Sequence, residues 1–379
     1  MGTVKTALPF QLDRSFPPSS ASPFAQAIEA SGVVDDFQAW DQLTSWWPKV
    51  LWKPENAPAA TVMKDCDSYA DAFILAAFAA AGTPKLGLAV STDAIRRGPA
   101  ELLQSMLTLA GATEGQTTLM LGAGELKQVK PFGYKRSTGL GRLEDAFRII
   151  QLLLETDDLI DFDGHYSTVR RAWIGAARPG RPRIWAMGGG PQLIDLAVRY
   201  ADGFTTVIPN AFATPERFAR EVRRMKRELE TLGRDPEKFD FAIWGAALVH
   251  DDEETVAKTL DNPLVRWITA AFGRLNQRDW KAEGIESVYP DDWHYALKLL
   301  PAQYTPEEVQ DVISRVSPAM SQRSWFAGNP KQVAASLQEY VDAGATWVSL
   351  CDFLPLVRPL EEAPEALARQ IEVCRILKN

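Results

Sequence analysis

The sequence predicts an α/β protein, a closed (β/α)8 TIM barrel with an irregular, largely helical insertion late in the chain. Two observations support this prediction. Strand-like and helix-like segments alternate along the 379 residues, which implies parallel strand pairing. The alternation gives roughly eight units, the number that closes a barrel, and glycine or polar residues follow several of the predicted strands. An open, doubly wound sheet is the alternative architecture.

The first half of the chain supplies four predicted strands and their helices. Short apolar runs predict strands at 4–12, 34–40, 85–91 and 117–121. Helical spacing of apolar residues predicts helices at 23–30, 68–81, 99–110 and 142–155. A loop rich in proline and tryptophan is expected at 44–61. The helix at 68–81 is apolar on nearly every side, so we expect it to be buried or to form a subunit interface.

The second half continues the pattern and then interrupts it. Strands are predicted at 183–187, 204–208, 239–249 and 346–351, after a loop that includes Tyr166 and 179–182. Helices are predicted at 191–201, 215–232, from 253, at 330–343 and at 362–377. Between 262 and 322 the pattern weakens and aromatic residues gather. We interpret this segment as an insertion or lid within a single domain spanning 1–379.

Composition limits the function classes. Hydrophobic residues make up 46% of the chain and charged residues 24%, the balance of a globular enzyme. A formal net charge of -8 argues against a nucleic-acid partner. No run of about 18 apolar residues predicts a membrane span, and no signal-peptide core is evident. Three widely spaced cysteines and three histidines without ligand spacing predict no disulfide framework, no metal site and a cytoplasmic protein.

A glycine-rich motif at 184–192 reads IWAMGGGPQ. It predicts a strand, a tight turn and a helix start. Backbone N–H groups at Gly188, Gly189 and Gly190 suit a phosphate, and the side chain of Gln192 can add a contact. A turn that binds nothing is the alternative. The dinucleotide fingerprint G-x-G-x-x-G is absent, which argues against a standard Rossmann site.

Seven segments carry distinctive motifs: LAVSTDAIRR at 88–97 with Pro99, LGAGE at 121–125, PFG at 131–133, RLED at 142–145, FDGHY at 162–166, GGGP at 188–191 with YADG at 200–203, and FAGNP at 326–330. In their order and spacing, these segments together resemble the luciferase-like superfamily of flavin- and deazaflavin-dependent enzymes. The elements TDxxRR and GxGE, and the position of the irregular segment, are most similar to the branch that uses the deazaflavin coenzyme F420. That branch includes phthiodiolone-type ketoreductases and sugar-phosphate dehydrogenases.

The resemblance implies an F420-dependent oxidoreductase with the cofactor ring in the barrel mouth, and often a homodimer. Such an enzyme moves a hydride between the deazaflavin and a carbonyl, an alcohol or an activated double bond. The resemblance also implies a bulge or cis peptide near Val90 and Ser91. An FMN-dependent monooxygenase that uses O2 is the alternative enzyme class. A barrel that binds a flavin-like ligand without turnover is a third hypothesis.

The proton donor is the main departure from this family. In the F420 branch a histidine usually follows the aspartate at the end of the second strand, but here the pair is Asp41 and Gln42. Glutamine cannot shuttle a proton near neutral pH. Glu125 is the candidate acid that remains, with orientation of the cofactor as its alternative role, and His294 in the insertion is the other candidate acid.

The expected binding residues follow from chemistry and from the resemblance. Ser91 and Thr92 offer hydroxyls. Arg96 and Arg97 offer cations for phosphate or for a glutamate tail, with solvated arginines at a helix start as the alternative. The expected cofactor set is Asp41, Val90, Ser91, Thr92, Arg96, Arg97, Gly122, Gly124, Gly188, Gly189, Gly190 and Gln192. Lys127, Lys130, Lys135 and Arg136 form a basic cluster that suits a polyanionic tail or a plain charged loop. Trp46, Trp47 and Trp293 are expected to line an apolar substrate pocket.

Overall fold

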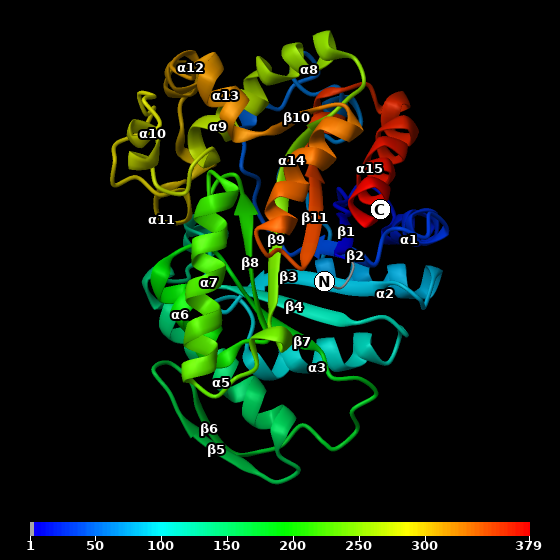
Figure 1. Cartoon of the computed structure of the whole chain (residues 1–379), viewed down its shortest axis with the longest axis vertical. Helices are drawn as coiled ribbons and strands as arrows, with labels where there is room; N and C mark the ends of the chain where they lie inside the picture. The colour runs from blue at the N-terminus through cyan, green and yellow to red at the C-terminus, as the bar shows by residue number, and fades with distance from the viewer. Residues whose placement is uncertain (1–3) are drawn as a thin grey trace.

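Eight parallel strands close into a barrel in the computed structural model, which describes residues 4–379 (Figure 1). Around the barrel the strands are β1 (Lys5–Pro9), β2 (Asp36–Trp40), β3 (Gly87–Asp93), β4 (Thr117–Gly122), β7 (Arg183–Met187), β8 (Gly203–Ile208), β9 (Asp240–Val249) and β11 (Trp347–Asp352). Pairing of β8 with β9 closes the ring. The predicted TIM barrel is confirmed, and the open-sheet alternative is wrong.

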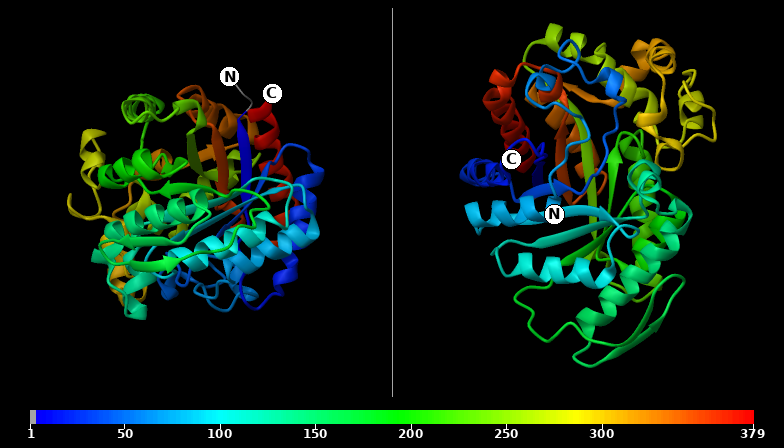
Figure 2. Two further views of the ribbon diagram at one scale, coloured as in Figure 1. Left: turned by 90° about the horizontal axis from the view of Figure 1, so that it is seen from below. Right: turned by 180° about the vertical axis from the view of Figure 1, so that it is seen from behind.

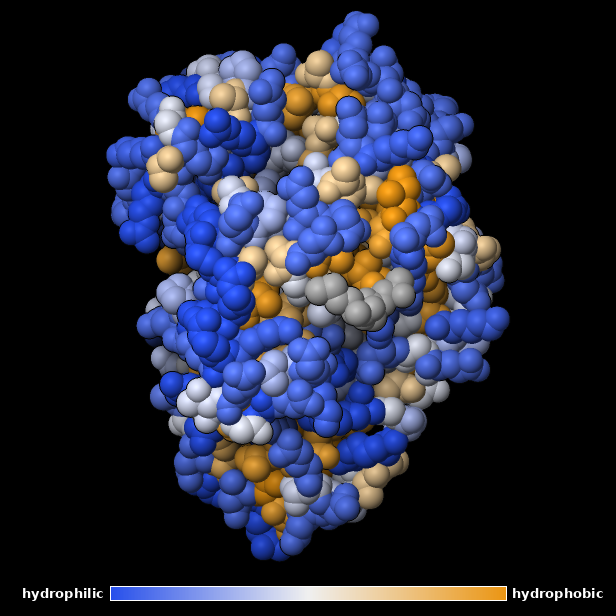
Figure 3. Space-filling model, in the orientation of Figure 1, coloured by the Kyte–Doolittle hydropathy of each residue, from blue (hydrophilic) through white to orange (hydrophobic). Residues whose placement is uncertain are grey.

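Helices connect the strands and cover the outside of the barrel (Figure 2). They are α1 (Ala21–Ala30), α2 (Ala72–Gly82), α3 (Pro99–Ala110), α4 (Leu126–Val129), α5 (Gly139–Glu155), α6 (Pro191–Tyr200), α7 (Pro215–Thr231), α8 (Glu253–Leu260), α14 (Pro330–Asp342) and α15 (Ala363–Lys378). Alternation of buried and charged residues explains their packing. In α7, Phe218, Val222, Met225 and Leu229 face the core, and the outward face is hydrophilic (Figure 3).

The ten-residue strand β9 carries a ninth strand beyond the barrel. Its first part pairs with β8, from Asp240 opposite Gly203 to Gly245 opposite Ile208. Its last part, Ala247–Val249, pairs with β10 (Phe326–Gly328). The chain therefore returns from the insertion to the barrel at the carboxyl end of β9.

The insertion is a compact helical layer at the carboxyl ends of the strands. It contains α9 (Pro263–Phe272), α10 (Arg278–Ala282), α11 (Tyr295–Lys298), α12 (Pro306–Ser314) and α13 (Pro318–Ser324). Its core of buried apolar residues includes Trp267 and Trp280, and it continues onto Trp47 and onto Leu248 of β9. In Figure 1 these helices lie at the top, and β5 and β6 lie at the opposite end.

Inside the barrel, inward-facing side chains form layers. Asp36, Gln38 and Trp40 point inward from β2, while Phe37 and Ala39 pack against the surrounding helices. At the end of the barrel where the strands begin, two indole N–H groups donate to aspartates. Trp347 Nε1 donates to Asp36 Oδ2 at 2.6 Å, and Trp185 Nε1 donates to Asp240 Oδ2 at 3.1 Å. Burial raises the pKa of Asp36 to about 6.

Several boundaries differ from the sequence predictions. The helix expected at 68–81 begins at Ala72, because Asp71 caps it by accepting from the backbone N–H groups of Phe73 and Ile74. The helix expected at 142–155 begins earlier, at Gly139. The strand expected at 4–12 ends at Pro9.

Two local features also differ. The loop expected around Tyr166 contains a hairpin of β5 (Ile160–Asp163) and β6 (Thr168–Ala172). The bulge or cis peptide expected near Val90 and Ser91 is wrong. Strand β3 keeps regular register with both neighbours there, and the cis peptide found among residues 4–379 is Ile208–Pro209.

The apolar helix α2 is buried on one side only. Ala72, Leu75 and Ala76 pack inward, whereas Ile74 is 51% exposed and Phe78 is 37% exposed. A role for this outward face in a homodimer stays a prediction. Within residues 4–379, no helix combines the length and the apolar character that a membrane crossing needs. Cys66, Cys351 and Cys374 are buried free thiols.

Candidate active site

Two stacked tryptophans form the floor of the barrel mouth. Trp40 ends β2 and Trp244 lies in β9, and their rings stack 5.4 Å apart at an angle of 9°. Neither indole Nε1 has a hydrogen-bond partner within residues 4–379, although both atoms are buried. Trp244 is only 9% exposed, so its N–H is a buried donor that a bound acceptor would satisfy.

A cavity of about 690 Å³ opens above these rings. Its size is typical of a site for a small molecule or cofactor. Its walls are mainly apolar and come from β2, β8, β9, β11, the insertion and the loop after β2. Asn210 Oδ1, just after β8, is a buried acceptor without a partner in the described chain and also lies on this cavity. The cavity therefore combines flat aromatic walls with a few unsatisfied polar atoms.

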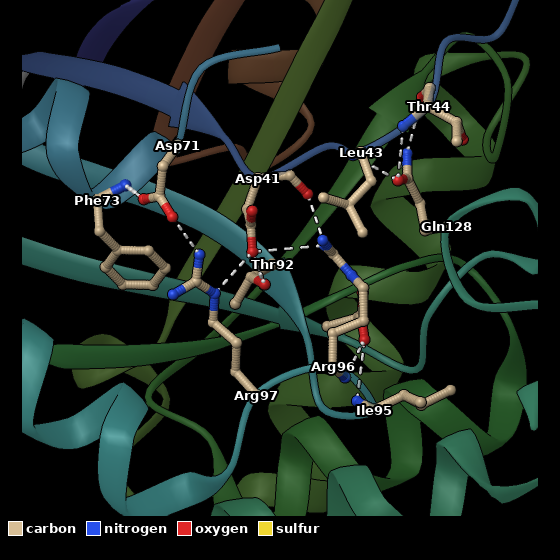
Figure 4. Close-up of polar contacts among 11 residues, drawn as sticks. Asp41, Leu43, Thr44, Asp71, Phe73, Thr92, Ile95, Arg96, Arg97 and Gln128 are labelled. Atoms are coloured by element: carbon tan, nitrogen blue, oxygen red, sulfur yellow. Dashed lines mark hydrogen bonds and ion pairs between the residues drawn. The ribbon is translucent and has the colours of Figure 1, made fainter. Parts of the chain in front are cut away.

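The expected cofactor residue Asp41 is the centre of an ionic network (Figure 4). Its Oδ2 accepts from Thr92 Oγ1 at 2.6 Å and from Arg97 Nε at 3.0 Å. Arg96 donates to the Asp41 carbonyl at 2.6 Å and also pairs with Asp93. Arg97 continues the network to Asp71, the cap of α2.

This network does not line the cavity. The sequence offers the two arginines as cations for a phosphate or a glutamate tail, but the structure pairs both with carboxylates of the chain. Val90 is fully buried in the core between the strands and the helices, so its side chain points away from the mouth. Ser91 is buried in β3, where its carbonyl accepts from the Asp41 N–H. Asp41, Thr92 and the arginines thus hold the ends of β2 and β3 to α2.

Gln42 and Trp46 do line the cavity. The indole Nε1 of Trp46 donates to Gln42 Oε1 at 3.2 Å. Trp46 also packs edge-on against Phe272 and stacks on Tyr295, both from the insertion. The insertion therefore packs over the segment that follows β2, and its role as a lid stays a prediction.

Trp47 is held by the same closure. Its Nε1 donates to the Leu264 carbonyl at 3.1 Å, and Trp267 Nε1 donates to the Trp46 carbonyl at 2.7 Å. Both bonds link α9 to the loop after β2. Trp46 and Trp47 thus contribute to the cavity wall, as the sequence suggests for an apolar pocket.

Glu125 and Lys127 form a second polar group beside Trp46. Lys127 is 2% exposed, and its Nζ lies 3.2 Å from Glu125 Oε2 and 4.8 Å from the centre of the Trp46 ring. Burial lowers the pKa of Lys127, and the charge of Glu125 opposes that change. Lys127 is therefore not a free surface cation of the predicted basic cluster. It is a buried ammonium that pairs with the candidate acid, and neither residue lines the cavity.

The glycines of the predicted phosphate loop differ in their surroundings. A Cβ on Gly189 would lie 2.6 Å from the side chain of Leu275, whereas one on Gly190 would meet nothing within 4 Å. Gly190 precedes α6, so open space lies at a helix N-terminus. Gly124 adopts a φ of +83° after β4, a conformation that glycine accepts at no cost. At Gly122 a Cβ would crowd Met187.

The cavity lies on another side of the mouth than the sequence suggests. Ser91, Gly124 and Gly189, at the ends of β3, β4 and β7, do not line it. Leu275 packs against Gly189, and Met187 lies beside Gly122.

His294 and Trp293 lie within the insertion and away from the cavity lining. Trp293 is 7% exposed and stacks on Tyr289, so it belongs to the core of the insertion. His294 caps α11, because its Nδ1 accepts from the Ala296 N–H at 3.2 Å. Burial, together with the charge of Arg136, lowers the pKa of His294 to about 4. His294 is thus neutral near pH 7, and its role as an acid stays a prediction.

Sequence reasoning places Trp40 and Asn210 at the ends of predicted strands, and both line the cavity with unpartnered polar atoms. It leaves out Trp244, which does the same, and the ion pair of Lys127 with Glu125. A signal for Trp40 exists in the alternation Asp36, Gln38, Trp40, which points one face of β2 into the barrel. No local signal distinguishes Lys127 from the basic residues that follow it.

Comparisons with known proteins agree with this architecture. Residues 51–346 match the model of a family described as luciferase-like monooxygenase. A phthiodiolone/phenolphthiodiolone dimycocerosates ketoreductase of Mycobacterium kansasii is 26% identical over 354 residues, which cover 91% of this chain and 94% of that protein. An F420-dependent glucose-6-phosphate dehydrogenase of Kineococcus radiotolerans is 24% identical over 372 residues, with coverage of 91% and 94%.

A solved structure has the same fold. It is an F420-dependent secondary alcohol dehydrogenase in complex with an F420-acetone adduct, with a TM-score of 0.73 at 18% identity, and all of both chains is covered. Together these findings confirm the resemblance to the luciferase-like superfamily and to its F420-dependent members.

Proposed function

Because this chain belongs to the luciferase-like monooxygenase family, we propose that it is an F420-dependent oxidoreductase acting on a carbonyl or alcohol, or on an activated double bond, of an apolar substrate. The observation that carries this proposal is the indole-lined cavity at the barrel mouth, with two buried N–H donors that lack partners within residues 4–379. The relatives named for F420-dependent activity support the choice of cofactor.

The residues of the cavity fit a flat heteroaromatic ring. Trp40 and Trp244 offer unpartnered N–H groups to ring carbonyl oxygens, and Asn210 offers an unpartnered oxygen to a ring N–H. The aromatic walls suit the faces of such a ring. Gly190, at the start of α6, offers open space and backbone donors for a phosphate. When bound, F420 would supply or accept a hydride.

Glu125 and Lys127 would donate or accept the proton that accompanies hydride transfer. The Lys127 ammonium balances the Glu125 carboxylate at 3.2 Å, so the two groups form one ion pair beside Trp46. Gln42 would orient a substrate oxygen, since Trp46 fixes its amide through the 3.2 Å hydrogen bond. Together, Glu125, Lys127 and Gln42 would take the place of the histidine that usually follows the aspartate at the end of the second strand in the F420 branch.

The insertion would exclude water from the reaction. Phe272 and Tyr295 cover Trp46, and the hydrogen bonds from Trp47 and Trp267 fasten α9 to the same loop. A dry, apolar mouth protects a hydride donor and strengthens polar contacts inside. It also favours a substrate with a large apolar body over a small charged one.

The proposal is tested with the purified protein and oxidised F420. Saturable quenching of F420 fluorescence, followed by reduction of F420 in the presence of secondary alcohols of increasing chain length, is the expected result. The Glu125→Gln variant should retain F420 binding and lose about a hundredfold or more in kcat, the usual contribution of a general acid. Absence of F420 binding at micromolar concentrations would contradict the proposal.

FMN-dependent oxygenation is the second candidate, because the matched family takes its description from monooxygenases. The same cavity could receive either tricycle. The discriminating measurement is copurification: tight FMN, with oxygen consumption on reduction, would reverse the order of the two candidates.

A further inference from the structure

A half-buried arginine with two unpartnered N–H groups lies on the same cavity. Arg369 projects from α15, the C-terminal helix that packs beside β1 and β11 (Figure 1). Its Nε and Nη2 atoms are buried and have no hydrogen-bond partner within residues 4–379. Leaving these two buried N–H groups unsatisfied is costly, so a ligand that accepts hydrogen bonds from them stabilises the site.

The two unpartnered atoms form the edge of the guanidinium that binds carboxylates elsewhere in this chain. Arg274 uses Nε and Nη2 to bind Glu283 at 2.6 and 2.8 Å. Arg358 uses the same two atoms to bind Glu362 at 2.9 and 2.6 Å. This parallel edge matches the two oxygens of a carboxylate in spacing and direction. Arg369 presents the same edge without a carboxylate.

The acidic groups around Arg369 are already engaged. The Asp352 carboxylate accepts from the backbone N–H groups of Val249 and Leu354 and from Gln370 Nε2. Burial raises the pKa of Asp352 to about 6, and the charge of Arg369 opposes that rise. Glu362 is bound by Arg358. These acids therefore moderate the positive charge of Arg369 but leave its donor edge unsatisfied.

A second donor lies on the same cavity. Gln11, two residues after β1, has a buried Nε2 without a partner in the described part of the chain. The rest of the lining is mostly apolar and includes Trp52, Met63, Leu354, Leu356 and Leu367. The cavity thus combines these donors with a mainly apolar wall.

We propose that this end of the cavity binds the carboxylate of an amphipathic substrate, with Arg369 as its bidentate partner and Gln11 as an additional donor. The apolar body of the substrate would lie along the apolar wall of the cavity, toward Trp40 and Trp244. The inference rests on the proposed function, because it assigns the far end of a substrate whose reacting end lies at the mouth. The substrate class is therefore a medium-chain carboxylic acid that carries a carbonyl, an alcohol or an activated double bond.

The test is calorimetric titration of the protein, free of cofactor, with decanoate, octanoate and 1-decanol. Decanoate is expected to bind more tightly than 1-decanol, and roughly fourfold more tightly per added methylene than octanoate. The Arg369→Met and Gln11→Leu variants test the donors, and Arg375→Met, an exposed arginine on the same helix, is the matched control. Arg369→Met should lose about tenfold or more in decanoate affinity and keep its affinity for 1-decanol.

Thermal unfolding of Arg369→Met shows whether the variant is folded. Because Arg369 is unsatisfied in the free protein, Arg369→Met should unfold at the same temperature as the wild type or at a higher one. Equal affinity for decanoate and 1-decanol, or decanoate binding unchanged in Arg369→Met, would overturn the inference. F420 titration is a separate measurement. Decanoate binding without F420 binding would refute the proposed function alone, and the converse would refute this inference alone.

Discussion

The Lys127 ammonium lies 3.2 Å from Glu125 Oε2, and it is one of the largest fully buried side chains in the protein. Glu125→Gln should therefore leave a buried ammonium without its counter-charge. We expect a loss of about 2–3 kcal/mol in unfolding free energy at pH 7, measured by urea titration, because Glu125 itself is partly exposed.

The loss of unfolding free energy in Glu125→Gln should become smaller as pH rises. Burial lowers the pKa of Lys127 below 10.5, and the variant lacks the carboxylate charge that raises it again. Between the lowered pKa and 10.5 the unfolded state binds more protons, so stability increases with pH in this window. The double variant with Lys127→Met is the control and should lose this slope. A pH-independent deficit in Glu125→Gln would contradict the pairing.

Asp36, the first residue of β2, should make the unfolding free energy depend on pH with the opposite sign. Its pKa is about 6 in the folded state, against 3.8 for an ordinary aspartate, so the folded state binds more protons between those values. Stability therefore falls as pH rises from about 4 to about 6 and stays reduced above that range. Asp36→Asn should be more stable than the wild type at pH 8 by roughly 2–3 kcal/mol and about equal to it near pH 4.

The measurement is urea unfolding at pH 4, 6 and 8. Asparagine can still accept from Trp347 Nε1, so the substitution removes the charge and keeps the hydrogen bond. Asp251→Asn, at an exposed aspartate, is the control and should leave the profile unchanged. A constant difference between Asp36→Asn and the wild type across this range would show that Asp36 does not titrate as stated.

Asp41 is expected to stabilise the fold and to act on the cofactor only indirectly. Asp41→Asn leaves Arg96 and Arg97 without their shared carboxylate and should cost about 3 kcal/mol or more. Asp71→Asn is the matched control, because asparagine caps α2 equally well and this aspartate is partly exposed, so it should cost less than about 1 kcal/mol. Weaker F420 binding in Asp41→Asn without a loss of stability would instead support direct contact.

The fold is predictable from this sequence because it depends on local periodicity. Strands such as Thr117–Gly122 are short apolar runs, and their alternation with helices determines the barrel. The hairpin Ile160–Ala172 is less visible, because only one face of it is buried and its other residues are charged.

The site is less predictable because it depends on distant contacts. Arg96 and Arg97 look like anion-binding groups until the fold brings Asp41 beside them, 55 and 56 residues away. The position of the cavity depends on the insertion, since Leu275 packs on Gly189 and Trp267 bonds to the Trp46 carbonyl. Pairing over such distances has no local sequence signal.

His294 should be dispensable for proton transfer. A pKa of about 4 keeps its ring neutral in the range where an enzyme of this kind works, and its Nδ1 already accepts from the Ala296 N–H. His294→Asn preserves a cap for α11 and should keep kcat within about twofold of the wild type, with the same pH profile. Loss of a kinetic pKa between about 5 and 8 in this variant would assign the acid to His294 instead of Glu125.

Two tryptophans separate a binding role from a structural one. Trp244 has an N–H without a partner in the described chain, whereas Trp267 donates its N–H to the Trp46 carbonyl. Phenylalanine removes the N–H from either residue and keeps an aromatic ring. Trp244→Phe should weaken F420 binding about two- to tenfold, since one neutral hydrogen bond is lost, and should change stability little. Trp267→Phe should lower the unfolding free energy by about 1–3 kcal/mol, because it leaves the Trp46 carbonyl unsatisfied.

F420 titration and urea unfolding of both variants measure this difference between Trp244 and Trp267. If both variants lose stability equally and bind F420 like the wild type, the stacked floor of the mouth is a packing feature and the cofactor lies elsewhere.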